Sequence, residues 1–281
     1  MFNIDHMKKL LLILFSCSVL LHNLYAQDEQ VQKEAEESVN DKALTLNFGA
    51  DIMSRYIWRG FDFGNSPAIQ PSIYLSWRGL NLGAWGSYSF ASNRIMINDT
   101  VSVNIGNYTE IDLYLSYTLK WFTFMFFDYF VPNGLDPDYT GLQNYQYFNY
   151  DKKTTGHAFE VSIGFSGPEK FPIKFFAGTV VYGSDKAKDT LGAYSNVNKN
   201  NFSTYLELSY PLTFHKIDIN FFAGGTPFGG SWYGPKAGFT NVGITARRSI
   251  PITKSYGLPV QASLITNPVA QKVFLVFGIS F

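Results

Sequence analysis

Residues 110–119 read EIDLYLSYTL, and every second residue of this stretch is large and apolar. Period two is the pattern of a β-strand that turns one apolar face and one polar face to its surroundings. The run is longer than the roughly five or six residues common in soluble sheets. It is long enough to cross a membrane, which takes about 9–11 tilted residues. The stretch therefore predicts a membrane-spanning strand with a lipid-compatible outer face.

The same period recurs along most of the chain. A run near 121–131 is rich in Phe on both faces, so its orientation stays open. An even number of strands suits a bacterial barrel with both ends in the periplasm. We predict twelve strands, near residues 44–59, 69–78, 80–91, 110–120, 121–131, 157–166, 172–182, 201–210, 215–224, 239–248, 258–266 and 271–281.

The connections between these runs alternate between long and short. This rhythm is typical of outer-membrane barrels, which have long extracellular loops and short periplasmic turns. Two links fit poorly, because 249–257 is long for a periplasmic turn and 266–268 is short for an outer loop. We expect long loops near 60–68, 92–109, 132–156, 183–200 and 225–238, and short links near 78–80, 119–121, 167–171 and 211–214.

The N-terminal region differs from the rest. Lys8 and Lys9 precede an apolar run of twelve residues, 10–21, and small or polar residues follow up to Ala26. This order is typical of a secretory signal peptide, and the run is too short for a spanning helix. We expect a signal peptide at 1–26 that contains Cys17, a flexible acidic periplasmic lead at 27–42 and a barrel at 43–281. A lipoprotein acylation site at Cys17 is the less favoured alternative.

Composition agrees with an exported membrane protein. Charged residues make up 16% of the chain and aromatic residues 17%, whereas soluble domains carry about 25% charged residues. Acidic and basic residues balance at 22 each, which argues against a nucleic-acid partner. A soluble β-sandwich or β-propeller also alternates, but its strands are usually shorter.

The expected fold is all-β, a closed antiparallel transmembrane β-barrel of about twelve strands. Closure follows because every backbone N–H and C=O in hydrocarbon must pair within the protein, and an open sheet edge would leave a row unpaired. The chain ends in an alternating strand that includes Phe277, Ile279 and Phe281. This end resembles the signal that the barrel-assembly machinery reads, so we expect that machinery and outer-membrane lipid as partners.

Several short motifs add a family resemblance. Residues 54–60, SRYIWRG, read as S-x-Y-x-x-R-G, and PAIQ at 67–70 and EIDLY at 110–114 accompany them. With the final strand, these segments resemble an uncharacterised bacterial family of predicted outer-membrane proteins that is sometimes labelled Gcw_chp. The resemblance implies the fold and the location only, because that family has no assigned activity.

Charged residues on the predicted inward faces are the candidate site. Acidic and basic groups that oppose each other in a lumen would orient a small polar solute. The alternative is internal salt bridging that fills a narrow barrel, since eight strands leave a packed interior and sixteen to eighteen a channel. The candidates are Asp51, Arg55, Arg59, Glu110, Asp112, Glu160, Glu207 and Asp218.

Loop aromatics form a second group, which includes Tyr139, Tyr145, Tyr147, Phe148, Tyr150, Phe228, Trp232 and Tyr233. They could bind sugars or a partner through stacking, but we favour a self-packed cap over the barrel mouth.

Enzyme signals are weak. A lipid-cleaving barrel needs a nucleophile and a base at the lipid face near the outer rim. His157 is near that rim, but Ser162 lies on the opposite face, and we expect His157 to be solvated. The chain has no serine-hydrolase elbow, zinc-protease or P-loop motif. We therefore expect no catalytic residue, no metal and no cofactor.

The favoured function is a small porin-like channel or a binder for a small polar solute, in the bacterial outer membrane. Two alternatives remain: a non-conducting structural or surface-interaction barrel, and a lipid- or lipopolysaccharide-modifying enzyme.

Overall fold

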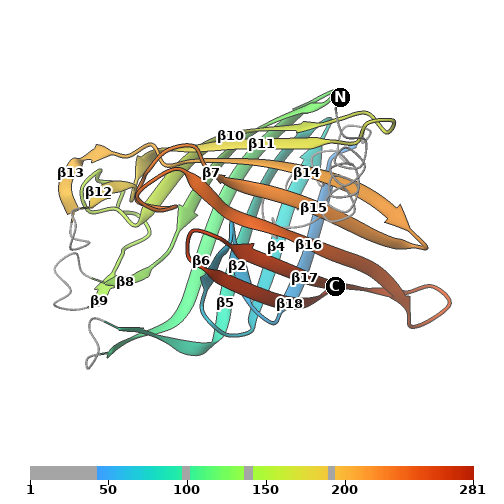
Figure 1. Ribbon diagram of the computed structural model, residues 1–281, viewed down its shortest axis with the longest axis horizontal. Coiled ribbons are helices and arrows are strands. Elements are labelled where there is room, and N and C mark those ends of the chain that lie inside the picture. The colour runs from blue at the N-terminus through green and yellow to red at the C-terminus, as the bar shows by residue number, and fades with distance from the viewer. Residues whose placement is uncertain (1–42, 97–101, 136–141, 189–193) are drawn as a thin grey trace, which may run out of the picture.

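The computed structural model describes residues 43–96, 102–135, 142–188 and 194–281, so the expected signal peptide and acidic lead lie outside the described residues. The described chain forms a closed antiparallel barrel of twelve strands (Figure 1). This confirms the predicted fold class and strand number. The wall consists of β1 (Thr45–Met53), β4 (Ala68–Trp77), β5 (Leu80–Met96), β6 (Ser102–Leu119), β7 (Phe122–Phe130), β10 (His157–Ser166), β11 (Lys174–Gly183), β14 (Thr204–Phe214), β15 (Ile217–Thr226), β16 (Gly238–Pro251), β17 (Gly257–Asn267) and β18 (Lys272–Ser280).

The first and last strands close the barrel. β1 pairs with β18 at Asp51↔Ser280, Ile52↔Ile279 and Met53↔Gly278. The N–H of Phe281 donates to the carbonyl of Ala50 at 3.0 Å, which extends this seam by one residue. The predicted terminal strand with Phe277, Ile279 and Phe281 is therefore the strand that seals the wall.

The two faces of the wall follow the alternation in the sequence. On β6, the side chains of Ile111, Leu113 and Leu115 are 37–45% exposed, whereas Asp112 is fully buried. Apolar side chains from the other wall strands continue this exposed face, among them Phe48, Ile73, Leu82, Phe175, Leu208, Leu264 and Leu275. The outer wall is thus apolar, whereas the inner face carries both polar and buried aromatic side chains.

The Phe-rich strand β7 obeys the same rule. Phe124 and Phe126 are exposed, and Met125 and Phe127 are buried. Its register with β6 pairs Leu115 with Phe126, which places both on the outer face. The orientation that the sequence left open is therefore settled by cross-strand pairing.

Tight turns join the strands at one end of the barrel, the short-turn end. Arg78 and Gly79 both have positive φ, 48° and 85°, as do His215 and Lys216 at 50° and 63°. Two consecutive residues of positive φ match the twist of a hairpin. The turn at 215–216 corrects the predicted link at 211–214, because residues 211–214 continue β14 as far as Phe214.

The opposite end carries the longer connections and is called the long-loop end. The predicted loop at 92–109 is wrong in extent, since β5 runs to Met96 and β6 starts at Ser102. The two poorly fitting links are genuine connections: 252–256 lies at the short-turn end, and 268–271 lies at the long-loop end. Small hairpins at this end are β2 (Tyr56–Trp58) with β3 (Phe61–Phe63), β8 (Asn133–Leu135) with β9 (Leu142–Asn144), and β12 (Lys186–Lys188) with β13 (Tyr194–Asn200).

The predicted strand at 44–59 is too long. The wall strand ends at Met53, and the chain then leaves the wall to form the β2–β3 hairpin. Among the described residues, no helix has the length and apolar character needed to cross a membrane.

Candidate functional site

The β2–β3 hairpin folds into the barrel. Tyr56 pairs with Phe63 and Trp58 with Phe61, and all three residues of β2 are buried. Arg59 and Gly60 form the turn, with φ of 48° and 84°. Counted around the wall from β1 through β4, β10 is the fifth strand after β1 in a ring of twelve. β10 therefore lies almost opposite β1. A hairpin that leaves β1 and contacts β10 therefore crosses the lumen to the far wall.

Arg59 makes that contact through an ion pair. Its Nη1 donates to Glu160 Oε2 at 2.6 Å, and its Nη2 donates to Oε1 at 2.8 Å. Both side chains are fully buried. Two parallel N–H···O bonds between a guanidinium and a carboxylate are among the stronger polar contacts in proteins. The pair fastens the tip of the hairpin to the inner face of β10.

Aromatic rings surround the guanidinium. Its carbon lies 4.3 Å from the ring centroid of Trp58, 4.9 Å from that of Tyr205 and 5.0 Å from that of Phe176. Arg59 also donates to the hydroxyl of Tyr233 at 2.5 Å. Cation–π attraction is stronger in a site without water, so the rings offset part of the cost of burying the charge.

The Glu160 carboxylate has further donors. Ser162 Oγ donates to Oε1 at 2.6 Å, and the Tyr129 hydroxyl donates to the same oxygen at 3.3 Å. Ser162 thus lies on the inward face, as predicted, and away from His157. A carboxylate with this many donors is suited to holding the hairpin rather than to meeting a solute.

Gly60 fits the tip of the hairpin against the wall. Its carbonyl accepts a hydrogen bond from Asn267 Nδ2 at 3.0 Å. A Cβ at this position would lie 1.8 Å from the carbonyl oxygen of Thr240. Only glycine therefore allows the turn to approach β16 so closely.

Replacing Gly60 with Ala is expected to destabilise the barrel by about 1–3 kcal/mol for the left-handed backbone alone, and by more because of the clash. Gly106→Ala is the matched control, because Gly106 has a similar φ of 78° and its nearest neighbour would lie 3.9 Å from the new Cβ. Urea unfolding in lipid vesicles measures both variants. Equal losses of stability in the two variants would show that the close approach of Gly60 to Thr240 does not affect stability.

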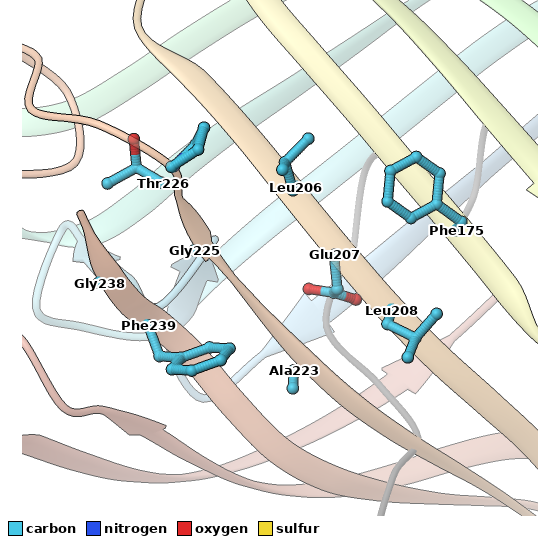
Figure 2. Close-up of a pocket in the computed structure, with 10 residues that line it drawn as sticks. Phe175, Leu206, Glu207, Leu208, Ala223, Gly225, Thr226, Gly238 and Phe239 are labelled. Atoms are coloured by element: carbon cyan, nitrogen blue, oxygen red, sulfur yellow. The ribbon is translucent and has the colours of Figure 1, made fainter.

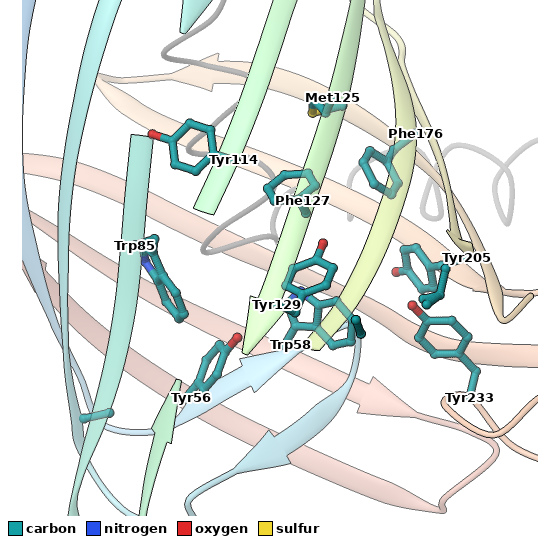
Figure 3. Close-up of a cluster of buried hydrophobic side chains, with 13 residues drawn as sticks. Tyr56, Trp58, Trp85, Tyr114, Met125, Phe127, Tyr129, Phe176, Tyr205 and Tyr233 are labelled. Atoms are coloured by element: carbon teal, nitrogen blue, oxygen red, sulfur yellow. The ribbon is translucent and has the colours of Figure 1, made fainter. Parts of the chain in front are cut away.

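A cluster of aromatic side chains fills the space around the hairpin (Figure 3). Trp58 lies 5.6 Å from both Tyr129 and Trp232, and Tyr56 lies 5.3 Å from Trp85, measured between ring centroids. Trp232 and Tyr233 come from the loop between β15 and β16. The predicted cap over the mouth is correct for these two residues, which pack inside it.

A second buried carboxylate lies beside the cluster. Tyr205 donates to Glu207 Oε2 at 2.5 Å, and Asn241 Nδ2 donates to the same oxygen at 3.0 Å. Gly224 faces this group, because a Cβ there would lie 2.1 Å from the Tyr205 hydroxyl. Glu207 is thus held by β14 and β16, and its donor Tyr205 contacts the guanidinium of Arg59 in the β2–β3 hairpin, which forms a plug in the lumen.

The other predicted lumen residues take separate places. Tyr108 donates to Glu110 at 2.8 Å, and Asp112 accepts the N–H of Phe130 at 3.2 Å. Asp51 on β1 lies opposite Gln70 on β4. Arg55 pairs with Asp62 at the base of the hairpin, partly exposed. Asp218 is exposed at the short-turn end and accepts from Thr213 at 2.8 Å.

Among the predicted set, the structure brings Arg59 and Glu160 together as a fully buried ion pair. Tyr233, whose hydroxyl accepts from Arg59, and the rings of Trp58 and Tyr205 were not assigned to the site from the sequence. One sequence pattern could have identified this site. Trp58-Arg59-Gly60 combines a turn glycine with a cation and a large aromatic ring.

The outer wall carries a different polar pair, and here the expectation of a solvated His157 is wrong. His157 is fully buried, and its Nδ1 lies 2.7 Å from Asp128 Oδ1. The register pairs Leu113 with Asp128 and Asp128 with Phe159, and Leu113 faces outward. Asp128 and His157 therefore lie on the outer face, near the long-loop end.

The connection between β7 and β10 covers this pair. The rings of Tyr150 and Phe130 lie 4.4 Å and 4.5 Å from that of His157, centroid to centroid. The Tyr147 carbonyl is 2.5 Å from His157 Nε2. Burial raises the pKa of the Tyr147 phenol, and the charge of Asp128 raises it further. Tyr147 and Tyr150 lie against the outer wall, so the predicted cap over the mouth is wrong for these two residues; Tyr139 lies outside the described residues.

A groove of about 300 Å³ also lies on the wall, between β11, β14, β15 and β16 (Figure 2). Its lining is mostly apolar and includes the exposed side chains of Phe175, Leu208 and Phe239. Because these side chains point outward, the groove is a feature of the outer surface rather than of the lumen.

The fold and this site define a class, a closed twelve-stranded antiparallel barrel whose lumen is crossed by a hairpin. No family model and no curated protein matches the chain. In the described part of the chain, no group of three or more His, Cys, Asp or Glu residues is arranged to hold a metal ion.

Proposed function

We propose that this chain is a bacterial outer-membrane protein whose barrel does not conduct in the conformation described, and which acts through its outer surface and loops. The observation that carries the proposal is the buried pair Arg59–Glu160, which fastens the β2–β3 hairpin across the lumen. This is the non-conducting alternative among the functions that the sequence allows.

Membrane placement is supported by the wall. Apolar side chains are exposed over β1, β4, β5, β6, β7 and β18, and such a surface needs an apolar solvent. A closed barrel satisfies the wall's backbone groups without water. The signal peptide at 1–26, cleavage after Ala26 and recognition of Phe281 by the assembly machinery are parts of the same proposal.

The porin-like alternative requires a path for a small polar solute. Glu160 and Arg59, which were candidates to line that path, bind each other instead, and their bond fastens the plug to β10. A path at the long-loop end would exist only after the hairpin leaves the lumen. The porin-like alternative therefore requires residues 54–67 to move out of the lumen.

The enzyme alternative has less support. A base on the outer face is present, because His157 pairs with Asp128 as a base does with its orienting group. Its Nε2, which would face a nucleophile, contacts the Tyr147 carbonyl instead. We therefore propose a structural role for this pair.

Conductance in planar bilayers tests the proposal. We expect no discrete channels from the intact protein, and discrete channels from a variant in which residues 55–65 are replaced by a short Gly-Ser linker. Arg55→Ala is the control, since it alters the exposed base of the hairpin and leaves the Arg59 contact in place.

Discrete channels from the intact protein would contradict the closed lumen and favour the porin-like function. Silence from both proteins would show that something other than the hairpin closes the barrel. Each protein is first checked for a heat-dependent shift on a denaturing gel, because a folded barrel migrates differently from the boiled chain.

A further inference from the structure

The connection between β7 and β10 presents aromatic side chains outside the barrel. Phe148 is 88% exposed and Tyr150 43%. Tyr150 stacks on His157, whose outward neighbour Phe159 stacks on Phe126 of the apolar wall. The exposed aromatics thus continue the apolar outer face toward the long-loop end.

This connection is held firmly in place. The Tyr182 hydroxyl on β11 donates to the carbonyl of Tyr150 at 2.8 Å, and the His157–Asp128 pair fixes the Tyr147 carbonyl. Within the connection, Asn149 Nδ2 donates to the Thr154 carbonyl at 3.2 Å. The exposure of Phe148 is therefore a feature of an ordered turn, fastened to three wall strands.

Two cations follow the aromatics. Lys152 and Lys153 are both exposed, and the Lys153 N–H is bound to Asp151 Oδ1 at 2.9 Å. An aromatic side chain next to lysines matches the boundary of a bilayer, where rings lie at the level of the headgroups and ammonium groups meet phosphates.

We propose that residues 145–155 form an interfacial anchor, in which Phe148 enters the boundary of the acyl chains and Lys152 and Lys153 bind lipid phosphate groups. The proposal rests on the membrane placement proposed above. The partner is a membrane lipid whose phosphate gives it a net negative charge, and the argument is the continuity of the anchor with the apolar wall together with its positive charge.

Spin labels measure the depth of each part. In a Cys17→Ser background, which has no other cysteine, a nitroxide is attached at Phe148→Cys in the full chain reconstituted in phosphatidylglycerol vesicles. Collisions with oxygen report lipid, and collisions with a water-soluble nickel complex report water. Leu115→Cys on the outer wall is the lipid control, and Ser255→Cys in the turn at 252–256 is the water control.

We expect the label at 148 to collide more with oxygen than with nickel, as at 115, and the label at 255 to show the reverse. Replacing both Lys152 and Lys153 with Gln, or using phosphatidylcholine without anionic lipid, is expected to move the label at 148 toward water.

The outcomes separate the two proposals. A water-exposed label at 148 with a lipid-exposed label at 115 would overturn the anchor and leave the membrane placement standing. A water-exposed label at 115 would overturn the placement itself. A label at 148 that enters lipid with no response to the lysines or to lipid charge would contradict binding of phosphate.

Discussion

Glu160→Gln is expected to lower the free energy of unfolding by about 3–5 kcal/mol, because it leaves the buried Arg59 guanidinium without its counter-ion. Gln has the shape of Glu, so the loss reports charge rather than volume. The side chains of Arg59 and Glu160 are both fully buried, and water cannot solvate the cation while the hairpin stays in the lumen. Urea unfolding in lipid vesicles measures the loss.

Two further variants test whether the loss comes from an unpaired buried charge. Arg55→Ala breaks the partly exposed pair with Asp62 and is expected to cost only about 0–1 kcal/mol. Replacing both Arg59 and Glu160 with Met removes both charges, and should recover much of the loss in Glu160→Gln. If Glu160→Gln costs no more than Arg55→Ala, the pair does not hold the plug.

Replacing His157 with Ala is expected to release the connection between β7 and β10, at a cost of about 3–5 kcal/mol for breaking a buried pair. The variant removes the ring between Tyr150 and Phe130 and leaves Asp128 without its partner. Trypsin cleavage after Lys152 or Lys153 should become faster. His215→Ala, in the exposed turn at the other end, is the control and should change stability by less than about 0.5 kcal/mol.

The hydrogen bonds of this pair orient the imidazole. The Tyr147 carbonyl can only accept, so Nε2 of His157 donates to it. Nδ1 of the same ring then faces Asp128 Oδ1 at 2.7 Å.

The sequence allowed the wall to be predicted strand by strand. Alternation such as that of Ile111, Leu113 and Leu115 reports burial directly, because each side chain of a barrel strand meets either the lumen or the outside. The plug was missed because Tyr56 and Trp58 fall on the same face as the apolar residues of β1, with Ser54 as the one polar residue of that face between Ile52 and Tyr56. Period two cannot distinguish a wall strand from a hairpin strand that folds inward.

The site was harder to predict than the fold for a physical reason. Arg59 and Glu160 are 101 residues apart, and their contact depends on how far the hairpin reaches across the closed barrel. The pair of Asp128 and His157 on the outer face is easier to recognise from the sequence. Asp128 is a charged residue at an outward position between Phe126 and Phe130, and a charge beside an apolar surface needs a partner.

The hairpin also has a consequence for the order of assembly. Residues 56–63 come before eleven of the twelve wall strands in the chain, yet they contact Tyr233 and Asn267, which are made 174 and 207 residues after their partners. Contacts between residues so far apart in the sequence form late. The hairpin can therefore make these contacts only after the loop between β15 and β16 and strand β17 have taken their places. Fastening of the plug is thus expected to be a late step in assembly, and it links the first strand made to the last ones.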